Sequence, residues 1–116
     1  MYGARTPSWL PVWHRRRILA TDESVVRDAL VGLYEGADGI GRRTTGEAYL
    51  PRRTAPVLAI YAGAATAVAD WDRSLAHGGH DEIVVWPENG HFLHQEEPDR
   101  FAAEVRRWLG TLPAAG

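Results

Sequence analysis

Two short apolar runs constrain the fold of this chain most strongly. Residues 56–62 read Pro-Val-Leu-Ala-Ile-Tyr-Ala, and residues 82–86 contain Ile-Val-Val and end before Pro87. Runs of this length and composition are typical of strands buried on both faces, as in a parallel sheet. Residues 67–76 have apolar positions at helical spacing and predict a helix between the two strands. The order strand, helix, strand predicts an α/β fold with a parallel pair joined by a crossover helix.

The flanking regions predict helices and loops. Residues 98–109 predict a final amphipathic helix that begins at a proline, and residues 22–35 predict an earlier helix. A glycine-rich loop is expected over 36–46, followed by one helical turn that Pro51 ends. At the amino end, Pro7 and Pro11 favour an extended or turn segment.

These patterns divide the chain into three regions. Residues 1–54 are expected to form an irregular and helical segment, residues 55–110 an α/β unit, and residues 111–116 a loose tail. Trp71, Trp86 and Trp108 are expected in the core.

Composition excludes several classes of partner and chemistry. The chain has 116 residues and a net charge of -2, so it fits one small domain and gives no electrostatic attraction to nucleic acid. It has no cysteine, which excludes disulfides and thiolate catalysis. No stretch approaches the roughly 20 apolar residues of a membrane span, and no secretory signal pattern is seen. We expect a cytoplasmic protein with no membrane or nucleic-acid partner.

Two weaker alternatives concern metals and membrane surfaces. His77 and His80 flank a glycine pair, but they do not match the ligand spacing of a known metal site. Trp9 and Trp13 precede an arginine run, but the apolar stretch is too short and proline-broken for a firm surface anchor. We expect neither a metal nor a cofactor.

The candidate chemistry lies in the histidine loop, residues 87–92, which read Pro-Glu-Asn-Gly-His-Phe. The loop follows a predicted strand, and functional side chains gather at the carboxyl ends of parallel strands. Gly90 permits a tight turn that aims the next side chain back over the strand end. His91 is therefore a candidate general base.

The wider context of this loop carries a family resemblance. A strand is followed by a proline, Gly-His-Phe, a second histidine at position 94, Glu-x-Pro and a phenylalanine that opens the last helix. This order resembles the C-terminal part of α/β-hydrolases over residues 55–110, and residues 22–50 are more weakly similar to the end of a cap insertion. The resemblance implies a Ser-His-acid triad that hydrolyses an ester-like bond, with His91 as the base.

The other members of such a triad do not map onto this sequence. The acid of the family often follows the penultimate strand, where this chain has Ala64-Ala65-Thr66. Asp70 is the substitute candidate for the acid, with Asp72 nearby and Glu47 as a weaker alternative. The nucleophile pattern Gly-x-Ser-x-Gly does not occur. The serines, none of which follows a predicted strand, are Ser8, Ser24 and Ser74.

We therefore expect a truncated α/β-hydrolase-like protein without independent activity. The alternatives are one half of a hydrolase completed by a partner chain, and a non-catalytic interaction module. A sheet of two strands is marginal in water and has open edges, so self-association, a complementing chain or poor stability is expected. A small-molecule substrate is expected only if the site is completed. Glu96, Glu97 and Asp99 are expected to cap the final helix and complement its dipole.

Overall fold

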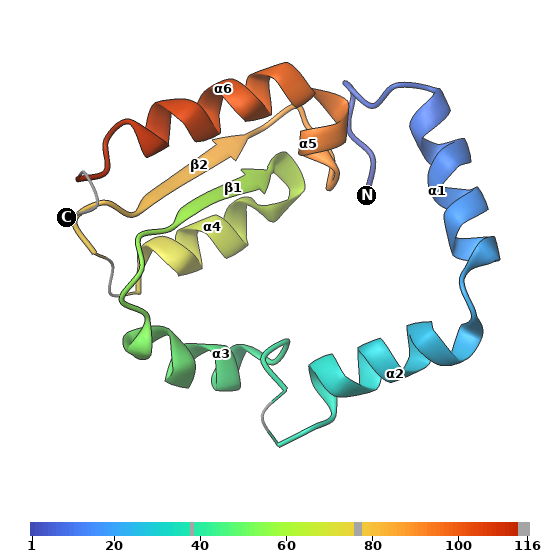
Figure 1. Ribbon diagram of the computed structural model, residues 1–116, viewed down its shortest axis with the longest axis horizontal. Helices are drawn as coiled ribbons and strands as arrows, with labels where there is room; N and C mark the ends of the chain where they lie inside the picture. Colours follow the sequence, from blue (N-terminus) through green and yellow to red (C-terminus); the bar gives the residue numbers. More distant parts are fainter. Residues whose placement is uncertain (38, 76–77, 114–116) are drawn as a thin grey trace. The chain divides into compact units, whose positions relative to one another are not determined.

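The computed structural model describes residues 1–37, 39–75 and 78–113 of the chain (Figure 1). Those residues form two compact units, one from Met1–Pro11 and Ala55–Gly116, the other from Val12–Thr54. Within the described residues, no helix has the length and apolar character that crossing a membrane requires.

The first unit contains a parallel pair of strands. Strand β1 (Leu58–Ala62) lies beside β2 (Glu82–Trp86), with Leu58 opposite Glu82 and Ala62 opposite Trp86. The 3-10 turn η2 (Gly63–Ala65) and helix α4 (Thr66–Arg73) connect the two strands. The structure thus confirms the mixed α/β class and the parallel pair with its crossover helix.

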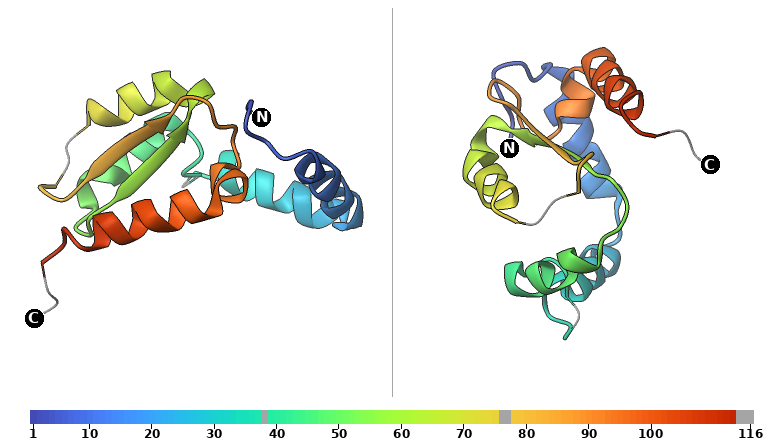
Figure 2. Two further views of the ribbon diagram at one scale, coloured as in Figure 1. Left: turned by 90° about the horizontal axis from the view of Figure 1, so that it is seen from above. Right: turned by 90° about the vertical axis from the view of Figure 1, so that its left-hand side faces the viewer.

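Helices cover both faces of this pair. Helix α4 lies on one face, and α6 (Pro98–Leu109) lies on the other (Figure 2). A single-turn helix, α5 (Leu93–Glu96), precedes α6 and was not predicted. Helix α6 has the predicted bounds, because proline suits the first turn of a helix, where its missing N–H is not needed.

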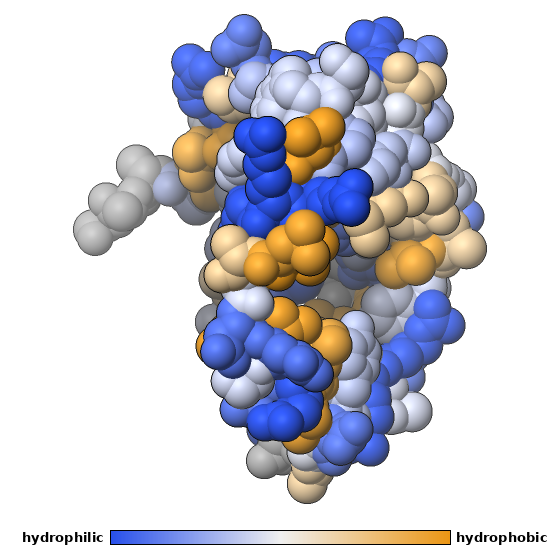
Figure 3. Space-filling view, turned by 90° about the vertical axis from the view of Figure 1, so that its right-hand side faces the viewer, coloured by the Kyte–Doolittle hydropathy of each residue, from blue (hydrophilic) through white to orange (hydrophobic). Residues whose placement is uncertain are grey.

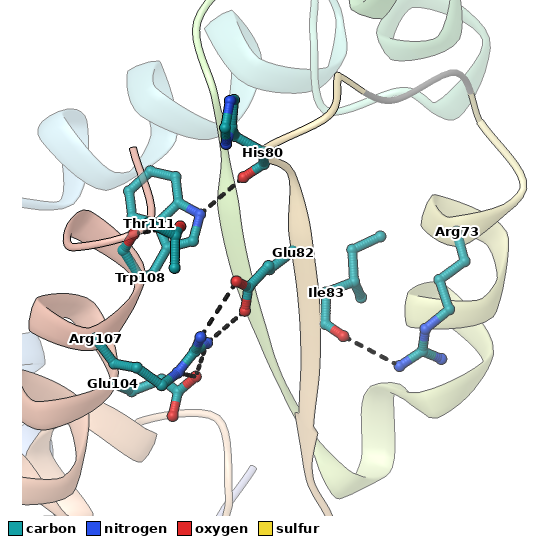
Figure 4. Close-up of polar contacts among 8 residues, drawn as sticks. All are labelled: Arg73, His80, Glu82, Ile83, Glu104, Arg107, Trp108 and Thr111. Atoms are coloured by element: carbon teal, nitrogen blue, oxygen red, sulfur yellow. Dashed lines mark hydrogen bonds and ion pairs between the residues drawn. The ribbon is translucent and has the colours of Figure 1, made fainter. Parts of the chain in front are cut away.

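Polar contacts join α6 to the beginning of β2 (Figure 4). The guanidinium of Arg107 pairs with the carboxylate of Glu82 and, at 2.6 Å, with that of Glu104. The indole N–H of Trp108 donates to the carbonyl of His80 at 2.9 Å. Hydrogen bonds and pairing with both carboxylates raise the pKa of Arg107, so this guanidinium stays charged. These contacts fix the helix at the end of the sheet opposite the histidine loop.

The apolar core of the first unit is small. Among the described residues, its buried apolar residues are Leu10, Ala69, Trp86 and Leu93. Trp86 is buried as predicted, whereas Trp71 and Trp108 are half-buried. The other strand residues are also half-buried, because a pair of strands leaves part of each strand uncovered at the edges.

One edge of β1 is open. The carbonyl of Val57 accepts a hydrogen bond from the N–H of Glu82 at 2.9 Å, so Val57 faces β2. In a parallel ladder, alternate residues point both backbone groups to the same neighbour. Leu58, Ile60 and Ala62 therefore direct their N–H and C=O groups away from β2. No strand in the described part of the chain lies on that side.

The second unit is helical. It contains most of α1 (Trp9–Ala20), then α2 (Glu23–Tyr34), α3 (Arg43–Tyr49) and the 3-10 turn η1 (Leu50–Arg52). The expected extended segment at the amino end is wrong from residue 9 onward. Pro11 lies in the first turn of α1, where its missing N–H removes no helical hydrogen bond. Helix α3 is longer than the single turn expected, and Pro51 lies within η1 rather than ending a helix.

Helix α2 confirms the prediction for residues 22–35. Asp22 precedes it and accepts a hydrogen bond from the N–H of Ser24 at 2.8 Å, which caps the helix. No residue of α2 is buried. On the face drawn in Figure 3, apolar residues lie at the molecular surface among hydrophilic ones. The exposed apolar side chains of this helix are Val25, Val26, Leu30, Val31, Leu33 and Tyr34.

Candidate functional site

His91 lies in the histidine loop, directly beyond the carboxyl end of β2. The loop turns back at its start, because the N–H of Asn89 donates to the carbonyl of Trp86 at 3.2 Å. The N–H of His91 donates to the carbonyl of Met1 at 2.7 Å. The imidazole is exposed and contacts the ring of Phe92 edge-on, and it forms no side-chain hydrogen bond within the described residues. Its nitrogens are thus free to bind a proton donor or acceptor.

A pocket of about 570 Å³ lies against His91. Its walls come from residues 1–4, from the end of β1 and the turn after it, and from the histidine loop. This volume is in the usual range of small-molecule sites, about 300–1,000 Å³. The lining is mostly apolar, and its polar side chains are those of Tyr2, Glu88, Asn89 and His91.

Glycines allow the backbone to approach closely around this pocket. A Cβ on Gly63 would lie 2.0 Å from the carbonyl oxygen of Pro87, and one on Gly90 would lie 2.5 Å from the amide nitrogen of Gly3. No glycine in the described residues has a positive φ. Gly90 is therefore required by the close approach of another segment, and not by the tight-turn conformation that the sequence suggested.

A buried carboxylate, Glu96, lies behind the histidine loop. It accepts hydrogen bonds from the N–H of Gly90 at 2.8 Å, from Nδ2 of Asn89 at 3.2 Å and from the hydroxyl of Thr6. The expectation that Glu96 caps the final helix is wrong, because α6 has no side-chain cap and the carboxylate binds the loop instead. Sequence reasoning missed this role, since Thr6 is 90 residues away.

The neighbouring carboxylate, Glu97, also binds the amino-terminal segment, residues 1–6. It pairs with Arg5 at 3.6 Å and with Arg100 at 3.2 Å. Arg5 pairs in addition with Glu88 of the histidine loop at 2.7 Å. The side chains of Arg5, Glu88 and Arg100 are exposed and that of Glu97 is half-buried, so solvent reaches every pair and screens its attraction. They support the contact between the segment and the loop but contribute little stability.

Opposing effects set the pKa of Glu96. Burial raises it, but the hydrogen bonds from Thr6, Gly90, Asn89 and Gly3 outweigh burial and hold the pKa below its usual value of 4.5. Because the folded pKa is lower than the unfolded one, the ionised carboxylate stabilises the fold above about pH 4.5. That stabilisation is lost as the pH falls through the folded pKa.

We therefore expect acid to destabilise the native chain more than a Glu96→Gln variant. The free energy of unfolding, measured by urea denaturation at about pH 6, 4.5 and 3, should converge for the two proteins at low pH. Asp22, Glu82 and Glu97 also have lowered pKa values, but both proteins contain them, so the difference isolates Glu96. Parallel pH curves would contradict the assignment.

The structure does not bring the candidate acids into the His91 pocket. Asp70 lies on α4 with an exposed carboxylate that pairs with Arg73 at 2.7 Å, and it is not part of the pocket lining. Glu47 lies on α3, in the other unit. Ala64 and Ala65 line the pocket at the place where the resemblance puts the acid.

Asp72 joins α4 to β1. It is buried and accepts a hydrogen bond from the hydroxyl of Tyr61 at 2.9 Å. Burial of the phenol, and then the contact with Asp72, raise the pKa of Tyr61 to about 12. This pair is a structural contact between the helix and the strand beneath it.

Within the part of the chain that the structure describes, no serine lines the His91 pocket and no metal cluster accompanies the histidine. Ser24 and Ser74 lie at helix ends, where their hydroxyls bond to Asp22 and to the carbonyl of Trp71. Residues 1–37, 39–75 and 78–113 hold no group of three or more metal-ligating side chains. His77, considered above for a metal, lies outside the described residues.

Comparisons of the chain with protein-family models, with curated proteins and with solved structures gave no match. Functional assignment therefore depends on the geometry around His91 and on the sequence of its loop.

Proposed function

We propose that this chain supplies the histidine base of an α/β-hydrolase-like enzyme that cleaves an ester-like bond. The serine nucleophile and the oxyanion hole would come from polypeptide outside this sequence, so the chain has no hydrolytic activity by itself. One observation carries the proposal: the unbonded imidazole of His91 lies at the carboxyl end of a parallel strand and faces a pocket of about 570 Å³.

This placement suits the chemistry of a general base. The imidazole would take the proton of an incoming serine hydroxyl and return it to the leaving group. A carboxylate must hold the imidazole in the correct tautomer. Asp70 is bound to Arg73 and lies outside the pocket, so we infer that the acid also comes from the completing polypeptide.

The open edge of β1 supports completion by more chain. Beside that edge, a groove of about 530 Å³ runs between β1 and α6 and reaches His91. Apart from His91 and His94, its lining is apolar: Pro56, Val57, Leu58, Ile60, Leu93, Phe101, Val105 and Trp108. A strand added along Leu58, Ile60 and Ala62 would pair the free backbone groups and cover this apolar surface.

The same edge also favours a second candidate function, that of a non-catalytic module that associates with a second copy. Pairing of two β1 edges would join the two sheets into one. The two candidates differ in whether His91 matters, because the edge does not require an imidazole.

The test is labelling by a fluorophosphonate, a probe that reacts with activated serines. The untagged chain is recovered from its source cells with an antibody, together with whatever polypeptide is bound or joined to it, and is then labelled. We expect His91→Ala to lower the labelling rate of that assembly by at least about 100-fold. His80→Ala is the matched control, because His80 is exposed and contributes only its backbone carbonyl to a described contact.

Two results would contradict the proposed enzyme. If no serine in the recovered assembly is labelled, the assembly is not a serine hydrolase. If the native and His91→Ala assemblies are labelled at equal rates, His91 is not the base. If the assembly contains only copies of this chain and stays unlabelled, the interaction module is favoured.

A further inference from the structure

The carboxylate of Glu96 joins the histidine loop to the amino-terminal segment, which is about 90 residues away in sequence. Oε2 of Glu96 accepts from the N–H of Gly90 and from Asn89, and Oε1 accepts from the hydroxyl of Thr6. The Thr6 oxygen in turn accepts from the N–H of Gly3 at 2.9 Å. Glu96 is only 8% exposed, so these protein donors replace most of the water that would otherwise solvate it.

These contacts hold the backbone N–H groups of His91 and of the residue before it. The N–H of Gly90, one residue earlier, is held by Glu96 itself. The N–H of His91 is held by the carbonyl of Met1, in the segment that Glu96 binds through Thr6. The imidazole has no hydrogen bond of its own within the described residues, so its place is set by its backbone and by its contact with Phe92.

We propose that Glu96 is a positioning residue for His91, acting by binding the histidine loop and the amino-terminal segment to each other. This inference rests on the proposed function, in which His91 is the base. A triad tolerates little misplacement, since a shift of about 1 Å can cost about 100-fold in rate. A carboxylate suits this position because Thr6, Asn89 and Gly90 all donate to it, and charged acceptors form the stronger hydrogen bonds.

Glutamine cannot replace Glu96 in this arrangement. Its amide has one oxygen and no charge, so in one orientation its NH₂ group would face the N–H of Gly90 and the amide of Asn89, which are donors. In the other orientation the NH₂ group would have to donate to the Thr6 hydroxyl, which already accepts from Gly3, and the charge-assisted hydrogen bonds to the loop would still be lost. The exposed pair of Arg5 and Glu88 cannot compensate, because solvent screens it. The loop and the segment should therefore separate in a Glu96→Gln chain while the sheet remains folded.

The experiment compares Glu96→Gln with Glu104→Gln in the full chain by NMR. Glu104 lies on α6 and pairs with Arg107, away from the loop, so it is a matched control. We expect Glu96→Gln to speed amide hydrogen exchange of Gly90 and His91 by at least about tenfold relative to an unchanged amide in β2. The imidazole signals of His91 should move toward those of an unfolded chain, and the fluorophosphonate labelling rate should fall at least tenfold.

A second pair of variants decides the matter if Glu96→Gln does not fold. Thr6→Val removes the hydroxyl that Glu96 binds, whereas Thr6→Ser keeps it. We expect Thr6→Val to shift the His91 imidazole signals and speed exchange at His91, and Thr6→Ser to behave as the native chain. Equal behaviour of the two Thr6 variants, or unchanged His91 signals in a folded Glu96→Gln chain, would overturn the inference. Absence of labelling in the native assembly would contradict the proposed hydrolase. The NMR results would then still test, separately, whether Glu96 positions His91.

Discussion

Replacing Gly63 with alanine should lower the free energy of unfolding by about 3 kcal/mol. The Cβ would lie 2.0 Å from the carbonyl oxygen of Pro87 and 2.7 Å from its carbonyl carbon. Both contacts are with backbone, so no side-chain rotation relieves them. The end of β1 must move away from the start of the histidine loop, which breaks the hydrogen bond from Gly63 to Asn89.

Urea denaturation followed by tryptophan fluorescence measures this effect. Gly79→Ala is the control, because a Cβ on Gly79 has no other atom within 4 Å, and we expect it to change the free energy of unfolding by less than about 0.5 kcal/mol. Equal free energies of unfolding for Gly63→Ala and Gly79→Ala would contradict the close approach of Gly63 to Pro87.

Truncating Trp86 to alanine should cost about 4 kcal/mol of unfolding free energy. Trp86 is 2% exposed at the end of β2, and the guanidinium of Arg100 lies 4.0 Å from the centre of its ring. Removal of the indole leaves a cavity under α6 and ends the cation–π contact. With so few other buried apolar residues, the first unit has little means of filling that cavity.

The matched control is Trp9→Ala, because Trp9 is 56% exposed. We expect that change to cost less than about 1 kcal/mol in the same urea titration. Similar losses from the two tryptophans would show that the burial of Trp86 does not stabilise this fold.

The strands and α6 could be predicted because their signals are local. The short apolar runs at 58–62 and 82–86 indicate strands without reference to any other part of the sequence. Pro98 likewise marks the start of α6. Helix α1 was missed because a proline normally signals a break in a helix. Pro11 does not break α1, because it lies in the first turn, but that position is known only once the start of the helix is known.

The candidate site was predictable only in part. The histidine loop was found from the resemblance of its sequence, and the structure places His91 against a pocket. The role of Glu96 was not predictable, because its partners are distant in sequence and a glutamate before a helix normally suggests a cap. The same holds for the contact of Asp72 with Tyr61, which needs the crossover geometry to bring a helix over a strand.

The way the amino-terminal segment is bound affects how this protein should be handled. The carbonyl of Met1 is bonded to His91, and Met1 and Tyr2 line the pocket. Any tag, linker or surface attached in front of Met1 would therefore emerge beside the imidazole and compete with whatever enters the pocket. The last turn of α6 lies at the other end of the sheet, where Trp108 binds the carbonyl of His80. Fusion partners and immobilisation chemistry belong after α6, whose last turn is at the end of the sheet away from His91.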